Sequence, residues 1–244
     1  MKRFLLLILM TGLANFAANA QFDLKKETGK LLKKTTGVGG LSNEEIGNGL
    51  KEALNAGVQK GVTTLSATDG YFKSELYKIL IPDDVRTITS KLKQVPGFGN
   101  VEEQLIEKMN RGAEKAASKA APIFANAITS LTFQDALNIL MGEKNAATQY
   151  LNKTTGDPLY QEFNPIIKAS LEEVGALKYW SECVTAYNKI PFVKKANPDL
   201  PDYVTKEGLK GLFGMVAEKE LEIRENPALR TTDLLKKVFA KQDK

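Results

Sequence analysis

Two short stretches of this chain combine charged side chains with small or apolar neighbours. In the first, Asn110, Arg111 and Glu114 stand among alanines in a segment with helical spacing. Arg111 and Glu114 are three residues apart, so on a helix they share one face and can form an ion pair. An arginine oriented by a carboxylate can also bind a carboxylate or phosphate group through two parallel hydrogen bonds. The sequence leaves both interpretations open.

The second stretch holds Glu220 and Arg224, four residues apart at the end of an apolar stripe. This spacing predicts a buried or half-buried ion pair, in a structural network that also joins the Arg111 cluster. Thr148 and Tyr150 are expected to supply hydroxyl groups to a cleft between these segments, and Tyr150 fits equally well as an aromatic core residue whose hydroxyl stays outside. The hypothetical ligand-binding set is therefore Asn110, Arg111, Glu114, Thr148, Tyr150, Glu220 and Arg224.

Catalysis has one candidate arrangement, in which Glu114 acts with Glu220 or Asp135 as the pair of carboxyl groups that a glycoside-cleaving hydrolase requires. Asp135 is better explained as the capping partner of Thr132 at a helix start than as a catalytic group. The chain has no histidine, which removes the usual general base, the usual partner of a serine or cysteine nucleophile and the commonest transition-metal ligand. We therefore assign no catalytic residue, no metal and no cofactor.

The first 20 residues have the pattern of a secretory signal peptide. Lys2 and Arg3 precede an apolar run, and Ala18-Asn19-Ala20 forms a small-x-small cleavage site. We expect cleavage between Ala20 and Gln21, and a soluble periplasmic protein. Residues 21–40 are predicted to be a basic, flexible leader. A weak contact of residues 24–34 with an anionic membrane surface is the alternative.

Charge and size limit the classes of function. The 34 basic and 29 acidic side chains give a net charge of +5, and loss of Lys2 and Arg3 with the signal leaves 32 against 29, or +3. This balance argues against binding to nucleic acid, which requires a dense basic surface. With 43% hydrophobic residues, the remainder of the chain can bury one sizeable core. We expect a single domain over residues 41–240.

The apolar periodicity is helical almost throughout. Ser42 and Glu45 form a capping box, and the helix that follows has small residues at 49, 53, 57 and 61. Because each glycine weakens a helix by about 1 kcal/mol, this column predicts another backbone packed closely against it. Other expected helix boundaries are Pro82-Asp83-Asp84, Asn100 with Glu103, Pro122, Thr132 to Gly142, Asp157-Pro158, Asn164-Pro165, Thr205, Asn226-Pro227, and Thr231 or Thr232.

Strand patterns are nearly absent, with only the short run Lys78-Ile79-Leu80-Ile81 before Pro82. The expected fold is all-α, an irregular single-domain helical bundle of about eight to ten helices.

Several blocks of the sequence together resemble a bacterial family, domain of unknown function 4197. They include LSNEEI at 41–46, GLKEAL at 49–54, DGYF at 69–72, MNRGAE at 109–114, Asp135-Ala136, ATQY at 147–150, Tyr203-Val204-Thr205 and IRENP at 223–227. Their order and spacing extend over nearly the whole chain after the predicted signal. The resemblance implies a signal-bearing envelope protein of a Gram-negative bacterium and no established activity.

The sequence therefore favours a non-catalytic periplasmic binding or envelope-interaction protein, with a helical cleft for an acidic or amphiphilic small ligand. A bundle with apolar walls and one arginine can hold such a ligand, because few polar groups suffice to orient it. The alternatives are the carboxylate-dependent hydrolase and a purely structural protein–protein scaffold that binds an envelope protein. The sequence leaves the oligomeric state open.

Overall fold

The structure, a computed structural model, describes residues 42–82, 86, 100–173, 175–189, 191–192, 195–196 and 199–240. The helices are α2 (Asn43–Ser66), α4 (Val101–Ala117), α5 (Ala120–Thr129), α6 (Phe133–Met141), α7 (Ala146–Glu172), α8 (Ala176–Asn188), α9 (Leu200–Glu225), the 3-10 helix η2 (Pro227–Leu229) and α10 (Asp233–Phe239). The all-α prediction is confirmed for these residues, which contain no β-strand. The number of helices lies at the low end of the predicted range.

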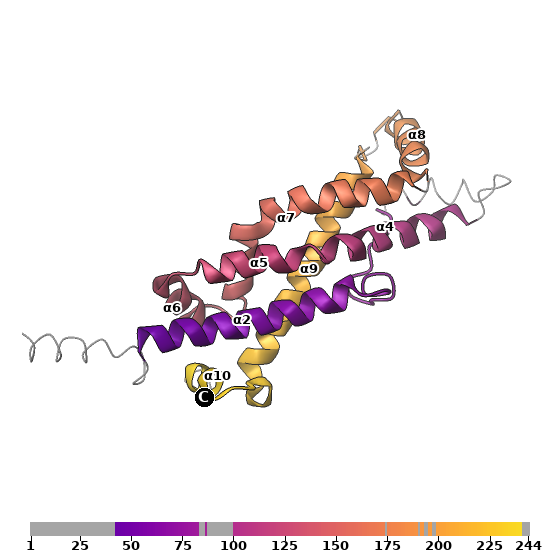
Figure 1. Ribbon diagram of the computed structural model, residues 1–244. Coiled ribbons are helices and arrows are strands. Elements are labelled where there is room, and N and C mark those ends of the chain that lie inside the picture. The colour runs from indigo at the N-terminus through magenta and orange to yellow at the C-terminus, as the bar shows by residue number, and fades with distance from the viewer. Residues whose placement is uncertain are drawn as a thin grey trace, which may run out of the picture.

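The helices form a row against one long partner (Figure 1). Helix α2, the nearly collinear pair α4 and α5, and α7 lie side by side, and α9 crosses behind them at a steep angle. The turn after α9 brings α10 back against α2 at one end, and α8 projects at the other. The core lies between the row and α9, where for example the rings of Phe124 and Phe213 meet edge to face at 5.8 Å.

Helix α2 begins as its sequence predicts. The Ser42 hydroxyl accepts a hydrogen bond from the Glu45 backbone N–H, and the Glu45 carboxylate accepts one from the Ser42 N–H. Its small-residue column packs against side chains of α9 and α10. At Gly49 an added Cβ would lie 2.7 Å from Cγ2 of Val238, so only glycine fits there without displacement. The expected close packing exists and is made mainly by side chains, with backbone in contact only at Gly61, where an added Cβ would lie 4.0 Å from the carbonyl carbon of Met215.

The α4–α5 segment confirms one boundary and corrects another. The helix restarts at Ala120, two residues before Pro122, as a proline near a helix start allows. Asn100 is at the N-cap position of α4, but its side chain forms no capping hydrogen bond, so the predicted capping pattern with Glu103 is wrong. The boundaries at Thr132 and Gly142 of α6 and at Thr232 of α10 are confirmed.

Helix α7 runs unbroken through both of its prolines. The prediction that Asp157-Pro158 and Asn164-Pro165 begin new helices is therefore wrong. Pro158 and Pro165 are seven residues apart, so they lie on one face two turns apart, and both are exposed. Because proline has no backbone N–H, each one leaves a carbonyl of the preceding turn without its usual donor. These carbonyls lie on the solvent side, where water can bond to them. Buried Leu151, Leu159, Phe163 and Ile167 hold the opposite face.

Helix α9 begins six residues before the start predicted from Thr205 as the residue preceding the helix. Asp199 caps it by accepting a hydrogen bond from the Asp202 N–H, and Thr205 lies inside the first turns. The Thr205 hydroxyl donates to the carbonyl of Pro201, a common arrangement within helices. The helix ends before Asn226-Pro227 as predicted.

The segment between α2 and α4 is irregular where it is described, over residues 67–82. The short run from Lys78 to Ile81 is extended but pairs with no strand there. The helix predicted to open at Pro82-Asp83-Asp84 and to end before residue 96 lies almost wholly outside the described residues.

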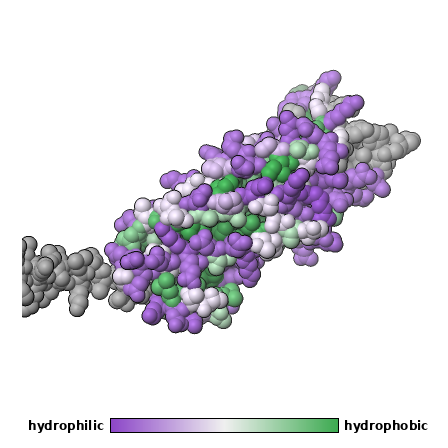
Figure 2. Space-filling model, in the orientation of Figure 1, coloured by the Kyte–Doolittle hydropathy of each residue, from purple (hydrophilic) through white to green (hydrophobic). Residues whose placement is uncertain are grey.

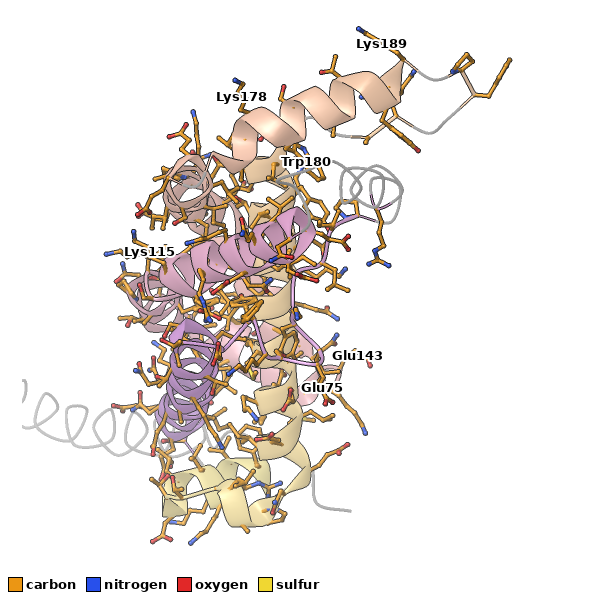
Figure 3. All side chains as sticks on the ribbon, turned by 90° about the vertical axis from the view of Figure 1, so that its right-hand side faces the viewer. Glu75, Lys115, Glu143, Lys178, Trp180 and Lys189 are labelled. Atoms are coloured by element: carbon orange, nitrogen blue, oxygen red, sulfur yellow. The ribbon has the colours of Figure 1, made fainter. Side chains whose placement is uncertain are left out.

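The surface is mainly hydrophilic, with apolar residues gathered in streaks between the helices on the face that Figure 2 shows. Helix α8 projects from one end with Lys178 and Lys189 pointing outward, whereas Trp180 points toward the body and is buried (Figure 3). Within the described ranges, no helix combines the length and hydrophobicity that crossing a lipid bilayer requires.

Candidate functional site

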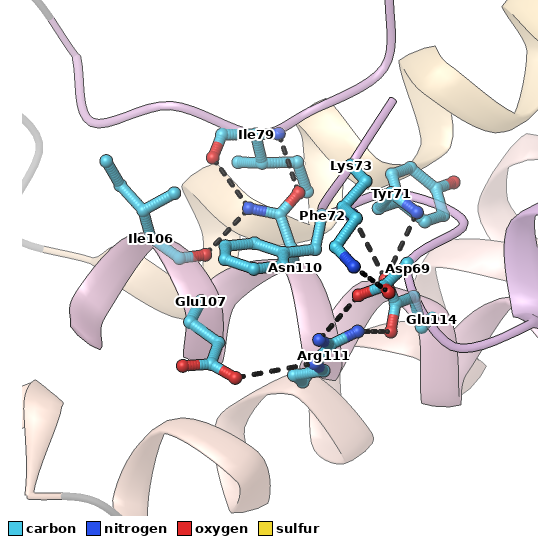
Figure 4. Close-up of polar contacts among 10 residues, drawn as sticks. All are labelled: Asp69, Tyr71, Phe72, Lys73, Ile79, Ile106, Glu107, Asn110, Arg111 and Glu114. Atoms are coloured by element: carbon cyan, nitrogen blue, oxygen red, sulfur yellow. Dashed lines mark hydrogen bonds and ion pairs between the residues drawn. The ribbon is translucent and has the colours of Figure 1, made fainter. Parts of the chain in front are cut away.

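The predicted polar residues lie in two clusters. The first, which we call the loop cluster, joins α4 to the irregular segment 67–82 (Figure 4). Glu114 is its centre: one oxygen, Oε1, accepts hydrogen bonds from the backbone N–H groups of Tyr71 and Phe72 at 3.2 and 3.0 Å. This carboxylate is buried, and its charge is matched by Arg111, whose Nη1 lies 2.8 Å from Oε2.

Arg111 is surrounded by protein carboxylates. Besides Glu114, its guanidinium contacts Oδ1 of Asp69 at 2.7 Å and Oε1 of Glu107 at 3.7 Å, and it stacks over the Phe72 ring. The hydrogen bonds to Glu114 and Asp69 raise the pKa of Arg111, and those from Lys73 and Arg111 lower the pKa of Asp69. With 31% of its side chain exposed, Arg111 is partly buried. An incoming anion would meet three carboxylates, so the geometry does not favour Arg111 as a ligand-binding group.

Asn110 holds the other end of the same segment. Its fully buried amide accepts a hydrogen bond from the Ile79 N–H and donates to the Ile79 carbonyl, both at 2.8 Å, and donates to the Ile106 carbonyl (Figure 4). The Asn110 amide thus bonds both backbone groups of Ile79, as a neighbouring β-strand would. Asn110 and Glu114, which lie one turn apart on α4, thus fix residues 71–79 to the core.

The second cluster, which we call the cap cluster, connects α9 to the ends of α6 and α7. The Glu220 carboxylate accepts hydrogen bonds from the backbone N–H groups of Ala147 and Thr148 at 3.0 and 2.8 Å, and from the Thr148 hydroxyl. These are the second and third residues of α7, whose own N-cap residue, Asn145, provides no side-chain cap. Glu220 therefore caps the start of α7, although it comes later in the sequence than that helix. Its negative charge lies at the positive end of the α7 dipole.

Arg224 completes the cap cluster from the same face of α9. It binds Oε1 of Glu220 through Nε and Nη2, and Nη2 also donates to the carbonyl of Ile139 in the last turn of α6, at 2.8 Å. Each of the two side chains is only 6% exposed. The predicted buried pair is present, and each partner neutralises a helix end of opposite sign.

One further buried charged side chain, Arg230, was not singled out from the sequence. It donates to the carbonyls of Ile223 and Arg224 at 3.1 and 2.8 Å and lies over the Phe239 ring, so it caps the end of α9. An arginine shortly after a helix is usually solvent-exposed, and no spacing distinguishes one that folds back onto the helix. Asp69, which contacts Arg111, entered the sequence analysis only as part of the DGYF block at 69–72.

The structure does not bring the two clusters together in one cleft. Tyr71, in the loop cluster, contacts α9 at Gly208 and Gly211, whereas Glu220 lies nine residues beyond Gly211, or roughly 13 Å along the helix axis. Asp135 belongs to neither cluster, because it closes the capping box with Thr132. Among the described residues, no interaction joins Glu114 to Glu220 or to Asp135. The pairing required by the hydrolase hypothesis is therefore not supported by this geometry.

Thr148 and Tyr150 have different positions. Thr148 is buried and belongs to the cap cluster through its hydroxyl. Tyr150 is half-buried against the core, and burial together with the charge of Asp135 raises its pKa. No described residue receives or donates a hydrogen bond at the Tyr150 hydroxyl, so it does not join Glu220.

Two hollows flank α9. A cavity of about 20 Å³ lies beside Glu220 and Arg224, among apolar residues of α2, α9 and α10. That volume suits about one water molecule. A larger groove of about 210 Å³ lies between α2, α9 and the turn to α10. It is lined by Ala56, Gly57, Lys60, Lys219, Glu222, Ile223, Leu229, Thr231 and Leu235. We call it the α2–α9 groove.

The charges along the α2–α9 groove are unevenly paired. The Lys219 ammonium contacts Glu222 and, at 3.1 Å, Glu218. Burial lowers the pKa of Lys219, but these hydrogen bonds outweigh it and the net direction is upward. Lys60 is exposed, and no described side chain forms a hydrogen bond or ion pair with its ammonium group, although its charge helps to lower the pKa of Glu218. Lys60 is therefore the charge at the groove that remains available to a ligand.

No group of three histidine, cysteine, aspartate or glutamate side chains within the described part of the chain is placed to hold a metal ion. Fold and clusters together define an all-helical protein whose buried polar groups anchor its own backbone.

Residues 40–240 match the family model described as a protein of unknown function, DUF4197, and the chain belongs to this family. The comparisons with curated proteins and with solved structures gave no match.

Proposed function

We propose that this protein is a non-catalytic, exported binding protein for an acidic or amphiphilic ligand, and that the ligand lies in the α2–α9 groove. The observation that supports the proposal is the contrast between that groove and the two clusters. Glu114, Arg111, Glu220 and Arg224 are bonded to the protein itself, whereas the groove combines apolar walls with the unpaired Lys60 ammonium.

Chemistry at the clusters would require a reactive group that is free to bind a substrate. Glu114 and Glu220 each accept two backbone hydrogen bonds and contact an arginine, so each carboxylate is engaged within the protein itself. Binding without catalysis is the function that this arrangement supports best. We place the binding site in the α2–α9 groove rather than around Arg111.

Native mass spectrometry of the protein, purified from cells that export it and without detergent, tests this proposal. We expect an additional mass that denaturation releases and that is acidic or amphiphilic. Only the mass of the unliganded chain, together with no change in melting temperature on addition of the cell's lipid and metabolite extracts, would contradict it. The intact mass also tests export, because cleavage before Gln21 removes 20 residues and a retained Met1 would contradict the signal prediction.

A protein–protein scaffold is the second candidate, and one observation favours it. The segment fixed by Asn110 and Glu114 holds Leu76 with 78% of its surface exposed, and Leu80 nearby is also exposed. Rigidly placed apolar side chains of this kind are typical of interaction surfaces. If the protein carries no ligand but Leu76→Asp abolishes its crosslinking to an envelope protein, the scaffold function replaces the binding proposal.

A further inference from the structure

The glycine at position 57 is not explained by packing. At Gly57 an added Cβ would meet Cδ1 of Ile223 at 3.6 Å and Cβ of Lys219 at 3.7 Å, which are ordinary contact distances. Gly49, in the same column, has no such room. Alanine is a better helix former than glycine in a helix interior, so α2 bears a cost at position 57 that its neighbours do not require.

Gly57 has instead a position between the two hollows. It lines both the α2–α9 groove and the small cavity beside Glu220, as does Ile223. The missing side chain therefore leaves the floor of the groove open toward the core. Lys60 lies one turn further along α2, and residues three apart share a helix face. One face of α2 thus presents an open apolar floor followed by a positive charge.

From this arrangement we propose that the groove binds a single unbranched acyl chain with one acidic head group. The inference rests on the proposed binding function and names its ligand class. The hydrocarbon chain lies against Gly57, Ile223 and Leu235, and the acidic group lies at the Lys60 ammonium. Lys219 is held by its two glutamates and positions the groove wall rather than the ligand.

The groove volume limits the length of the chain. On the same measure the groove has about 210 Å³ against about 20 Å³ for the small cavity, so it has room for several consecutive groups of a hydrocarbon chain. A free fatty acid and a lysophospholipid share the required chemistry, since each has one chain and an anionic head group.

The first experiment measures the affinity of a series of straight-chain carboxylates, from butanoate to dodecanoate, by NMR titration of the full-length mature protein. We expect the affinity to rise about fourfold for each added methylene group and to level off within the series, where the chain becomes longer than the groove. An affinity that is independent of chain length, or that rises without a plateau to dodecanoate, would overturn the proposal. Lysophosphatidylglycerol with an octanoyl chain, run in parallel, distinguishes the two sources by which head group binds more tightly.

Two variants separate the groove from the rest of the surface. Lys60→Gln should weaken octanoate binding about two- to fivefold and leave octanol binding unchanged, as expected for loss of one exposed ion pair. Lys153→Gln, at an exposed lysine of α7 away from the groove, is the matched control and should have no effect. Equal effects of the two lysine variants would contradict the assignment of the head group to Lys60.

Gly57→Ala tests the floor of the groove. Its methyl group fits without displacement, so the melting temperature should stay the same or rise, while the plateau of the chain-length series moves down by about one carbon. An unchanged plateau in a folded Gly57→Ala variant would remove the acyl chain from this floor. If a different class of ligand co-purifies and the carboxylates do not bind, this inference fails and the proposed binding function stands. If neither binds, both fail.

Discussion

The loop cluster and the cap cluster use the same chemistry for different purposes. In each, a buried glutamate accepts hydrogen bonds from two consecutive backbone N–H groups and is neutralised by an arginine three or four residues away on its own helix. Glu114 binds a segment that has no regular structure, whereas Glu220 binds the start of a helix. Only the second glutamate therefore gains from a helix dipole.

The arginines differ in the same way. Arg224 is buried and donates hydrogen bonds to carbonyls at the end of a helix. Arg111 is partly exposed and contacts several carboxylates. The comparison teaches that a buried charge pair is not by itself a sign of a ligand site. Its role depends on whether its remaining donors and acceptors bond to the protein backbone or face an open space.

The largest effect should follow from breaking the cap cluster. Glu220→Ala leaves the Arg224 guanidinium buried without its anion and uncaps α7, so we expect a loss of about 3–5 kcal/mol in the free energy of unfolding. Urea denaturation followed by circular dichroism measures it. Glu162→Ala, at an exposed position of α7, is the control and should change stability by less than about 0.5 kcal/mol. A loss below 1 kcal/mol for Glu220→Ala would contradict the capping role.

Removal of Asn110 should have the next largest effect, because its amide satisfies two backbone groups of Ile79. In Asn110→Ala these groups are left unpaired, at a cost of about 1–3 kcal/mol. The loss should be local at first, so the amide of Ile79 should exchange with deuterium faster while that of Thr148 keeps its protection. Equal loss of protection at both amides would mean that the two clusters are not independent.

Tyr77 gives the loop region a dependence on alkaline pH. Its hydroxyl donates to Glu218, and burial together with that hydrogen bond raises its pKa from 10.0 to about 12. A raised pKa means that the stabilisation is complete below pH 10 and is lost as the pH rises toward 12. Tyr77→Phe should cost about 1 kcal/mol at pH 8 and less as the pH approaches 12. Melting temperatures across this range measure it, and a constant difference between the two proteins would refute the linkage.

The smallest expected effect tests the separation of the two clusters. The sequence suggested that Arg111 and Glu220 belong to one network, in which case their substitutions would be coupled. Since the structure places them in different clusters, Arg111→Ala and Glu220→Gln should be additive within about 0.5 kcal/mol in a double-mutant cycle. Arg111→Ala with Glu114→Ala is the positive control, because these residues are in contact and should be non-additive.

Local signals predicted the parts of the fold that depend on near neighbours. The capping boxes of Ser42 with Glu45 and of Thr132 with Asp135 were found because both partners lie within one turn. The Glu220–Arg224 pair was found for the same reason. The partners that make it a helix cap lie more than 70 residues away in the chain, and no spacing rule reaches that far.

The errors arose where packing overrode a local preference. Proline and threonine are common at helix starts, so Pro158, Pro165 and Thr205 predicted boundaries that do not exist. Each is accommodated by its surroundings: the prolines lie on the exposed face of α7, and the Thr205 hydroxyl bonds back to its own helix. The α2–α9 groove could not be predicted, because it is formed by residues of α2, α9 and α10 that no motif connects.

The position of α9 in the chain has a consequence for how the protein reaches its native state. This helix is the common partner of α2, α4 and α7, yet it spans residues 200–225 of 244. During synthesis, the apolar faces of the earlier helices therefore have no central partner until most of the chain has left the ribosome. The core of this domain therefore cannot close before α9 has been made, and until then the earlier helices stay accessible to proteins that bind unfolded segments.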